Sequence, residues 1–311
     1  MKENILFTCA GGAGTLYLAQ SLQNDFHVFL ADGNEHIAAR YMGFPFRKIP
    51  FGSSLSYANT MRDLIAEWHI NYIVPGADEE ILPCIALCEE GIVRCVAPNR
   101  SFVELCLHKK NLMCVLHEKK ISSLLPFEKE SDVQYPAIAK PVYGRGSRQV
   151  HRLDHPTQLS GYLQLYEKGF SDVLVQPYID GDEYTVSVVV NNINQIIGIV
   201  PKRIIEKRGI TRVAVSECSD SIIRVCRHIV DSLHPCGPFN VQLTIRDGVC
   251  FIFEINPRLS TTAVLTDRAF GNEVALYIQY FDCVDLSSLP VCKGGVNLFR
   301  YEAHHFVDES I

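Results

Sequence analysis

The sequence predicts an α/β protein whose N-terminal part is a Rossmann-like domain. A short apolar strand at residues 4–9 leads through a glycine-rich turn into a helical pattern at 15–22, and a second strand at 27–31 follows. Glycines at the turn after the first strand are typical of the Rossmann βαβ unit. The rhythm continues with an amphipathic helix at 57–68 and short strands at 71–74 and 93–97. These observations predict a parallel sheet covered by helices.

Length and composition indicate a folded chain of more than one domain. With 311 residues, 47% of them hydrophobic and 21% charged, the chain can form two or three domains with a sizeable core. The formal net charge of −6 argues against a general nucleic-acid or anionic-membrane surface. No apolar run reaches the roughly 18 residues of a membrane span, and no signal peptide is visible after Met1. The 12 cysteines include no CxxC pair, so we expect them to be reduced and mostly buried, in a cytoplasmic protein.

The first glycine turn contains Gly11, Gly12 and Gly14. Free backbone N–H groups in such a turn can hold a phosphate, and Asp32 stands about where an acid would bind a ribose. The spacing is not GxGxxG, so a tight turn in a Rossmann-like domain is the better interpretation. A nicotinamide site, and with it a dehydrogenase, is a rival interpretation.

Asp78 and Glu79 open a helix directly after a short buried strand. Acidic residues in a first turn favour the helix dipole, which is their ordinary role. They also stand at the carboxyl end of a strand, where open α/β sheets bind ligands. We therefore keep both as substrate-site candidates.

A strand at 135–140 ends in Lys140 and runs directly into a loop with Gly144, Gly146, Ser147 and two arginines. A lysine beside flexible backbone N–H groups can cradle phosphates. The loop is not a Walker A motif, because GxxxxGK[ST] is absent. An ordinary hairpin with a surface lysine is the alternative. A single long helix at 101–120 precedes this segment and carries Lys109 and Lys110.

Two later segments have groups suited to a nucleotide. The strand at 173–176 gives way at Pro177, and the backbone of the linker that follows could bind an adenine edge. Glu183, just past the turn at 180–181, could accept hydrogen bonds from ribose hydroxyls. Five basic residues then lie within 202–212. They form either a solvated basic loop or a group that neutralises a triphosphate or binds a carboxylate substrate.

The stretch Cys250–Arg258 places Glu254, Asn256 and Arg258 at alternate positions of a strand and just beyond it. Alternate side chains of a strand share a face. A carboxylate and an amide oxygen beside a guanidinium suit a magnesium ion that bridges phosphates. A preceding strand at 238–245 forms a hairpin with this one, which brings Gln242 near the two oxygen ligands.

The combination of these segments resembles the ATP-grasp carboxylate–amine ligases, most nearly the branch of the carbamoyl phosphate synthetase large subunit. The resemblance extends from the N-terminal domain to about Tyr301, and its most specific elements are residues 135–147, 175–183, and Gln242 with the motif at 254–258. It implies a pre-ATP-grasp domain at 1–105, a lid at 106–177 and a larger lobe with the metal site at 178–311. A helix from about residue 262 to Tyr280 and a last strand at 296–301 complete this lobe.

The resemblance also implies a role for most candidate residues, with the glycine loop shorter and richer in arginine than in the synthetase. Lys109 or its neighbour Lys110 contacts the nucleotide phosphates, and Lys140 contacts them too. The roles implied for the others are closure over the phosphates (Gly144, Gly146, Ser147), contact with adenine (Gln176, Tyr178, Ile179) and ribose (Glu183), binding of a divalent metal (Gln242, Glu254, Asn256) and of the transferred phosphoryl group (Arg258), and a first glycine turn that faces the acceptor substrate (Gly11, Gly12). Apart from the resemblance, Asp78 and Glu79 stay substrate-site candidates because they stand at the end of a strand. The basic residues Arg203, Arg208 and Arg212 indicate a carboxylate-bearing substrate.

These roles predict an ATP-dependent ligase that uses Mg²⁺ or Mn²⁺. A small-molecule carboxylate would attack the γ-phosphate, and an amine would displace phosphate from the acyl phosphate to form an amide or peptide bond. We expect no nucleic-acid or membrane partner, and a homodimer is possible. The alternatives are a carboxylate or carbamate kinase, and a non-catalytic nucleotide-binding protein of the same fold.

Overall fold

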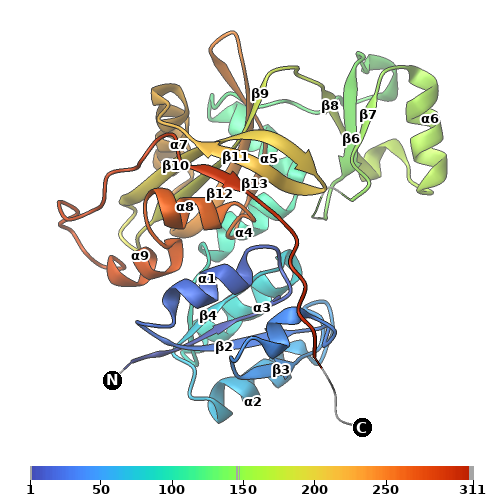
Figure 1. Ribbon diagram of the computed structural model, residues 1–311. Coiled ribbons are helices and arrows are strands. Elements are labelled where there is room, and N and C mark those ends of the chain that lie inside the picture. The colour runs from blue at the N-terminus through green and yellow to red at the C-terminus, as the bar shows by residue number, and fades with distance from the viewer. Residues whose placement is uncertain (1, 145, 147, 308–311) are drawn as a thin grey trace.

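A computed structural model describes residues 2–144, 146 and 148–307 of the chain. It consists of an N-terminal α/β unit, a large antiparallel sheet covered by helices on both faces, and a small lid that projects to one side (Figure 1).

The N-terminal unit is built on a five-stranded parallel sheet with the order β3-β2-β1-β4-β5. This order corresponds to the first five strands of the doubly wound 3-2-1-4-5-6 sheet. The central strands β1, β2 and β4 are apolar and largely buried because helices cover both faces, whereas the edge strands β3 and β5 carry exposed basic residues. Its elements are β1 (Asn4–Phe7), α1 (Thr15–Leu22), β2 (His27–Asp32), β3 (Phe46–Lys48), α2 (Tyr57–Glu67), β4 (Tyr72–Val74), α3 (Asp78–Glu89) and β5 (Arg94–Cys95).

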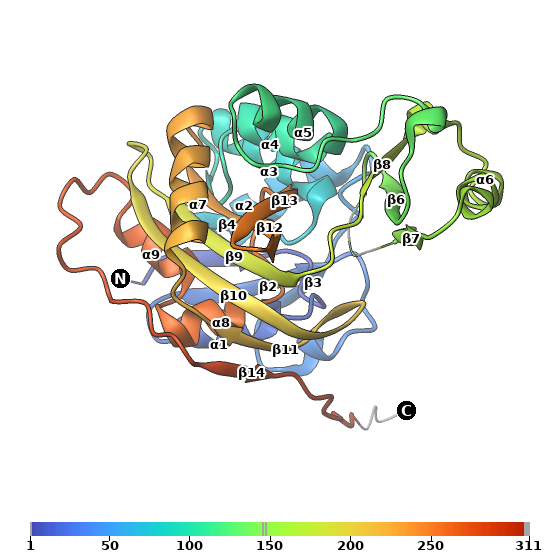
Figure 2. The ribbon, with the colours of Figure 1, turned by 90° about the horizontal axis from the view of Figure 1, so that it is seen from above.

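The large sheet is six-stranded and antiparallel, with the order β13-β12-β9-β10-β11-β14. Helices α4, α5 and α7 cover one face, where alternate strand residues such as Val186, Val188 and Phe239 form the core. Helices α8 and α9 lie on the other face (Figure 2). The elements are α4 (Arg100–Leu107), α5 (Lys109–Glu118), β9 (Asp182–Val190), β10 (Ile196–Arg208), β11 (Ile210–Ser216), α7 (Asp220–Leu233), β12 (Gly237–Arg246), β13 (Val249–Asn256), α8 (Ala263–Ala269), α9 (Glu273–Gln279) and β14 (Asn297–Phe299).

The lid is a three-stranded antiparallel sheet, β7-β6-β8, with one helix packed on it. It has a small core of its own and projects away from the large sheet (Figures 1 and 2). Its elements are β6 (Ala137–Pro141), β7 (His151–Leu153), α6 (Pro156–Leu165) and β8 (Val173–Pro177).

The N-terminal unit and the large sheet share a hydrophobic core. Side chains from β1 and α1, including Phe7 and Leu18, belong to the same buried cluster as Val189 of β9 and Val274 and Tyr277 of α9. Burial of apolar surface between the two units holds them together. The carboxyl ends of β1 and β4 are thereby fixed relative to the end of β13.

The expected hairpin of residues 238–245 and 250–256 is confirmed, since β12 and β13 pair antiparallel. Three other expectations were wrong. The single helix at 101–120 is broken at His108, whose φ of −99° and ψ of 87° are not helical. The basic run at 202–212 is not a loop but most of the β10–β11 hairpin, turning at Gly209. The helix up to Tyr280 is divided at Gly271, and Asn272 caps α9 through its side chain.

The 12 cysteines form no disulfide, and all of them lie within the described residues. Among those residues, no helix is both long and apolar enough to cross a membrane.

Candidate active site

A pocket of about 290 Å³ lies between the lid and the large sheet. Its walls come from β6, β8, the β10–β11 hairpin, the β12–β13 hairpin and the segment after β13. Nearly all the predicted nucleotide and metal residues line it: Lys109, Lys140, Gly144, Gly146, Gln176, Tyr178, Ile179, Glu183, Gln242, Glu254, Asn256 and Arg258. Ser147, which was predicted with them, lies outside the described residues.

The β12–β13 hairpin presents the predicted metal ligands side by side. Gln242 is opposite Glu254 and Asn240 is opposite Asn256. The register shifts between Gln242 and Leu243, which leaves Phe253 as an extra residue in β13. Such a bulge turns two successive side chains toward the same side, and Phe253 and Glu254 both line the pocket.

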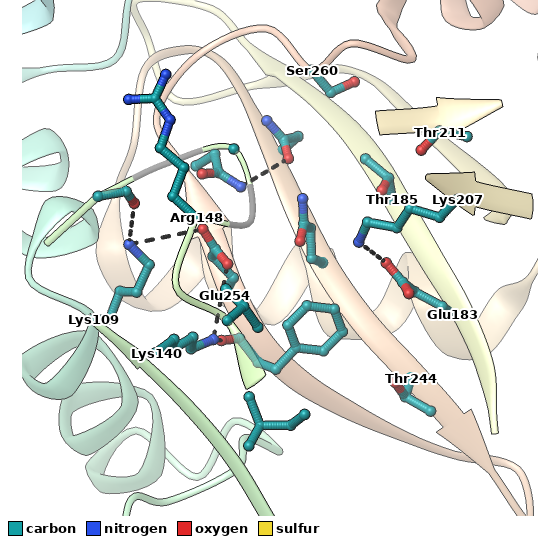
Figure 3. Close-up of a pocket in the computed structure, with 18 of the residues that line it drawn as sticks. Lys109, Lys140, Arg148, Glu183, Thr185, Lys207, Thr211, Thr244, Glu254 and Ser260 are labelled. Atoms are coloured by element: carbon teal, nitrogen blue, oxygen red, sulfur yellow. Dashed lines mark hydrogen bonds and ion pairs between the residues drawn. The ribbon is translucent and has the colours of Figure 1, made fainter. Parts of the chain in front are cut away.

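Two buried lysines lie on either side of the Glu254 carboxylate (Figure 3). The Lys140 ammonium is 3.8 Å from Glu254 Oε2 and donates to the carbonyl of Phe253 at 2.8 Å. The Lys109 ammonium is 4.0 Å from Glu254 Oε1 and donates to the carbonyl of Gly144 at 2.5 Å. Burial lowers the pKa of Lys140 to about 8, an effect that Glu254 opposes and Lys109 and Lys207 reinforce. Two ammonium groups in this position can also receive phosphate oxygens.

The break at His108 puts Lys109 in the pocket. The His108 ring accepts a hydrogen bond from the backbone N–H of Asn111, so it caps α5, and Lys109 becomes the first residue of that helix. The Lys109 backbone N–H donates to Val142 in the loop after β6. Lys110 points elsewhere, donating to the carbonyls of Phe170 and Ser171 in the lid. Lys109, rather than Lys110, is therefore the lysine placed for a phosphate.

The loop after Lys140 needs its glycines. Gly144 and Gly146 have φ values of +132° and +70°, which residues with a side chain rarely adopt. Both glycines line the pocket, and the carbonyl of Gly144 accepts from Lys109. Arg148 lines the same side (Figure 3).

β8 and the residues that follow it offer groups for a planar base. Gln176 is 1% exposed, and its Nε2 donates to the Leu124 carbonyl. Its Oε1 is buried without a hydrogen-bond partner among the described residues, which is costly unless a ligand donates to it. An exocyclic amine of a base is such a donor. Tyr178 holds its place through a hydrogen bond from its N–H to the Pro136 carbonyl, and the Arg152 guanidinium stacks on its ring.

Glu183, the predicted ribose acid, forms an ion pair with Lys207 at 2.6 Å (Figure 3). Lys207 projects from β10 and also lines the pocket. It belongs to the basic run at 202–212, but sequence reasoning did not single it out. Knowing that the run forms a hairpin would have revealed it, because Lys207 then shares a sheet with Glu183 and Thr185.

The donor set at the hairpin suits a magnesium ion bound together with phosphates. The Asn256 amide nitrogen donates to Asn240, and Asn240 in turn donates to the Arg258 carbonyl. This chain leaves Asn256 Oδ1 as the acceptor, beside the Glu254 carboxylate and Gln242. Sequence reasoning missed the orienting role of Asn240. One carboxylate and two amides bind Mg²⁺ weakly alone, and phosphates normally complete such a site. No group of three or more histidine, cysteine or acidic side chains in the described part of the chain offers an alternative metal site.

Arg258 lies at the inner edge of the pocket and contacts the N-terminal unit. Its Nε donates to Asp78 Oδ1 at 2.5 Å. Of the predicted substrate residues, Asp78 is therefore the one that joins the site. Gly12 lines a separate pocket between α1, α8 and β14.

The remaining substrate candidates are not among the residues that line the pocket. The Gly11 N–H donates to Asp32 at 2.8 Å, so the Asp32 carboxylate is used inside the turn, as expected for a tight turn. Arg203 pairs with Glu217, and Arg212 pairs with Glu302. The backbone of Glu79 packs against Gly52.

Comparison with known proteins agrees with this arrangement. The ATP-grasp domain family matches residues 106–262. The arginine-specific carbamoyl phosphate synthase large chain of Oryza sativa subsp. japonica is 30% identical over 162 residues, which are 47% of this chain and 14% of that protein. The chain thus matches a small part of this curated relative's length.

Two solved structures share the fold. A biotin carboxylase domain of the Hydrogenobacter thermophilus 2-oxoglutarate carboxylase, solved as a dimer with MgADP and bicarbonate, covers 96% of this chain and 73% of its own, with a TM-score of 0.73 and 13% identity. The L-amino acid ligase of Bacillus licheniformis covers 90% of this chain and 74% of its own, with a TM-score of 0.68 and 16% identity. The family match includes half of the sequence. Lys109, Lys140, the glycine loop and the β12–β13 hairpin all lie inside it. The chain therefore belongs to the ATP-grasp family.

Proposed function

We propose that the protein is an ATP-dependent ligase that activates a small-molecule carboxylate as an acyl phosphate and joins it to an amine. ADP and phosphate are the other products. The observation that carries the proposal is the position of Lys109 and Lys140 on either side of Glu254, with two amide side chains beside it on the same hairpin. ATP-grasp enzymes use ATP and Mg²⁺, as the MgADP of the 2-oxoglutarate carboxylase domain illustrates.

The residues of the pocket fit the two steps. In the first, a carboxylate oxygen bonds to the γ-phosphorus of ATP and the bond to ADP breaks. Lys140, Lys109 and Arg258 stabilise the negative charge on the phosphoryl oxygens. In the second, the amine nitrogen bonds to the acyl carbon and phosphate leaves, while the amine gives up a proton. Glu254, Asn256 and Gln242 would hold Mg²⁺, which supplies charge neutralisation at the phosphates.

The nucleotide roles follow the geometry of the walls. Gln176, Tyr178 and Ile179 would contact adenine, and Glu183 with Lys207 the ribose. Gly144 and Gly146 would close over the phosphates. In this proposal residues 1–105 form the pre-ATP-grasp domain, 106–177 the lid and 178–311 the larger lobe. Within 106–177, α5 packs on the large sheet, so the part of this range that moves would be the β7-β6-β8 sheet with α6, the lid as described above.

A screen for ADP release tests the proposal. Carboxylic acids are combined with a panel of amines in the presence of Mg·ATP, with Glu254→Ala as the blank. Release that requires both a carboxylate and an amine supports the ligase. Calorimetry that detects no binding of ATP with Mg²⁺ present would overturn it.

A second candidate is phosphoryl transfer alone, with the acyl phosphate as the product. The similarity to a carbamoyl phosphate synthase large chain favours it, because carbamoyl phosphate is itself an acyl phosphate. Product analysis separates the two: ADP release with a carboxylate and no amine, together with hydroxylamine-trappable product, identifies the kinase.

A further inference from the structure

The ion pair between Arg258 and Asp78 connects the N-terminal unit to the pocket. Arg258 Nε and Asp78 Oδ1 are 2.5 Å apart, and each side chain is only 15% exposed. The two residues are 180 positions apart in the sequence. No described residue of the N-terminal unit, Asp78 included, lines the pocket itself. Asp78 therefore connects this unit to the pocket through its bond with Arg258.

Asp78 is held in place by its own turn. It is the first residue of α3, and the carboxylate of Glu80 accepts hydrogen bonds from the N–H groups of Gly76 and Ala77 and from the Thr8 hydroxyl. Gly76 packs so closely on β1 that an added Cβ would lie 2.6 Å from the Thr8 carbonyl oxygen. The turn cannot shift without breaking these contacts, so the backbone that carries the Asp78 side chain is fixed. The Glu80 carboxylate accepts from the N–H groups of Gly76 and Ala77, and the Asp78 carboxylate accepts from Arg258.

The contacts of Arg258 leave one edge of its guanidinium for a ligand. Nε donates to Asp78, and Nη1 donates to the Leu259 carbonyl at 3.2 Å. A guanidinium has five N–H donors, so, as far as the described residues are concerned, both hydrogens of Nη2 and the second hydrogen of Nη1 remain. Arg258 lines the pocket two residues after the end of β13, the strand that carries Glu254 and Asn256. A phosphate oxygen pair can bind a planar N–H edge of this kind.

We propose that Asp78 is a positioning residue for the reaction: it orients the Arg258 guanidinium so that its free edge faces the transferred phosphoryl group. This inference rests on the proposed function. It gives the N-terminal unit a part in phosphoryl transfer that is separate from substrate binding. If Asp78 only linked the two units, its substitution would instead weaken the binding of phosphate and of Mg·ADP equally.

The test measures inorganic phosphate binding to the protein saturated with Mg·ADP, by calorimetry, in four proteins: wild type, Asp78→Asn, Asp78→Ala and Glu89→Ala. Asn retains an oxygen that can accept from Nε, whereas Ala does not. Glu89 lies on the same helix and forms an exposed pair with Arg100, so it is the matched control. Thermal unfolding of each variant is recorded in parallel.

We expect Asp78→Ala to weaken phosphate binding about tenfold, because Arg258 is no longer oriented and loses about one charge-assisted hydrogen bond to the phosphate. Asp78→Asn should lie between Ala and wild type, and Mg·ADP affinity should stay within about twofold in all four proteins. In turnover, kcat should fall while the KM for ATP stays constant. Unchanged phosphate binding in Asp78→Ala, or an equal loss of phosphate and Mg·ADP binding, would overturn the inference.

The two proposals fail in different ways. If the wild type binds Mg·ADP and phosphate but releases no ADP with any substrate pair, the ligase is contradicted and the phosphate comparison still decides the role of Asp78. If the wild type binds Mg·ADP but no phosphate, the role of Asp78 is contradicted.

Discussion

The Lys140 ammonium lies 3.8 Å from the Glu254 carboxylate, at a site where burial lowers the pKa of the lysine from 10.5 to about 8. The lysine is therefore charged at neutral pH and begins to lose its proton near pH 8. Phosphates favour the charged form, so a protein that has lost this proton must regain it to bind ATP.

We predict that the affinity for Mg·ATP falls as the pH rises above about 8, approaching tenfold per pH unit. Folding stability should respond in the opposite direction. Between pH 8 and 10.5 the unfolded chain binds more protons at this lysine than the folded protein does, so the contribution of Lys140 to stability rises with pH. Calorimetric titrations from pH 7 to 9.5, about the range where this lysine titrates, measure the affinity. Lys140→Arg should flatten the profile, and an unchanged slope in that variant would contradict the assignment.

Glu254→Gln should nearly abolish turnover. The substitution keeps the size of the side chain but removes the one carboxylate of the hairpin donor set, so Mg²⁺ loses its anionic ligand. We expect the rate of ADP release to fall at least about 100-fold, while ATP binding persists through Lys109 and Lys140. The measurement is ADP release against Mg²⁺ concentration. Glu67→Gln, which alters an exposed pair with Arg47, serves as the control. A Glu254→Gln protein with the wild-type Mg²⁺ dependence would remove Glu254 from the metal site.

A third buried lysine, Lys202, lies in strand β10 of the large sheet. Lys202 is fully buried, donates to Ser187 at 2.5 Å and to Thr266 at 2.7 Å, and Ser187 donates to Glu273 at 2.5 Å. Removing one of the two groups leaves the other buried without its partner. Lys202→Met or Glu273→Leu alone should therefore each lower the unfolding free energy by about 3–5 kcal/mol. The double variant should cost clearly less than the sum of the two. Urea unfolding of the four proteins gives the coupling energy, and simple additivity would show that the two groups act independently.

Arg300 joins three segments that are distant in the sequence. Its guanidinium donates to the carbonyls of Ala13 in the first glycine turn, Thr211 in β11 and Thr261 after β13. Arg300→Ala should lower the unfolding free energy by about 2–4 kcal/mol, because it removes several charge-assisted bonds and leaves carbonyls unpaired. Arg62→Ala, at an exposed pair with Glu90, should change it by less than about 1 kcal/mol. Equal effects of the two substitutions in urea unfolding would contradict this role.

The site was predictable from the sequence where its residues are neighbours along the chain. Glu254 and Asn256 could be paired because alternate residues of a strand share a face, and Gln242 because a two-residue turn closes the hairpin. Lys140 was predictable because it ends a strand at a glycine loop. Lys109 could not be separated from Lys110, since the choice depends on a helix break at His108 that the helical pattern conceals.

Local pattern could not identify the partners that come from other elements. The bulge at Phe253, which turns that residue and Glu254 to the same side, depends on the pairing of β13 with β12. Lys207 meets Glu183 because the basic run folds as part of the β10–β11 hairpin, whose hydrogen bonds outweigh the polar character of the sequence. Arg203 and Arg212 seemed suited to a carboxylate substrate, but glutamates already pair with them.

The sequence by itself determined the α/β class, the order of the motifs and the oxygen-bearing side chains that share one face of the hairpin, because these depend on side-chain periodicity and on contacts within a few residues. Only the tertiary structure decided that Lys109 and Lys140 enclose Glu254 and that Asp78 holds Arg258. Those relationships form when apolar cores dock the lid and the N-terminal unit against the large sheet. The free energy gained by burying apolar surface does not depend on separation along the sequence, so it can bring together charged groups as far apart as Asp78 and Arg258.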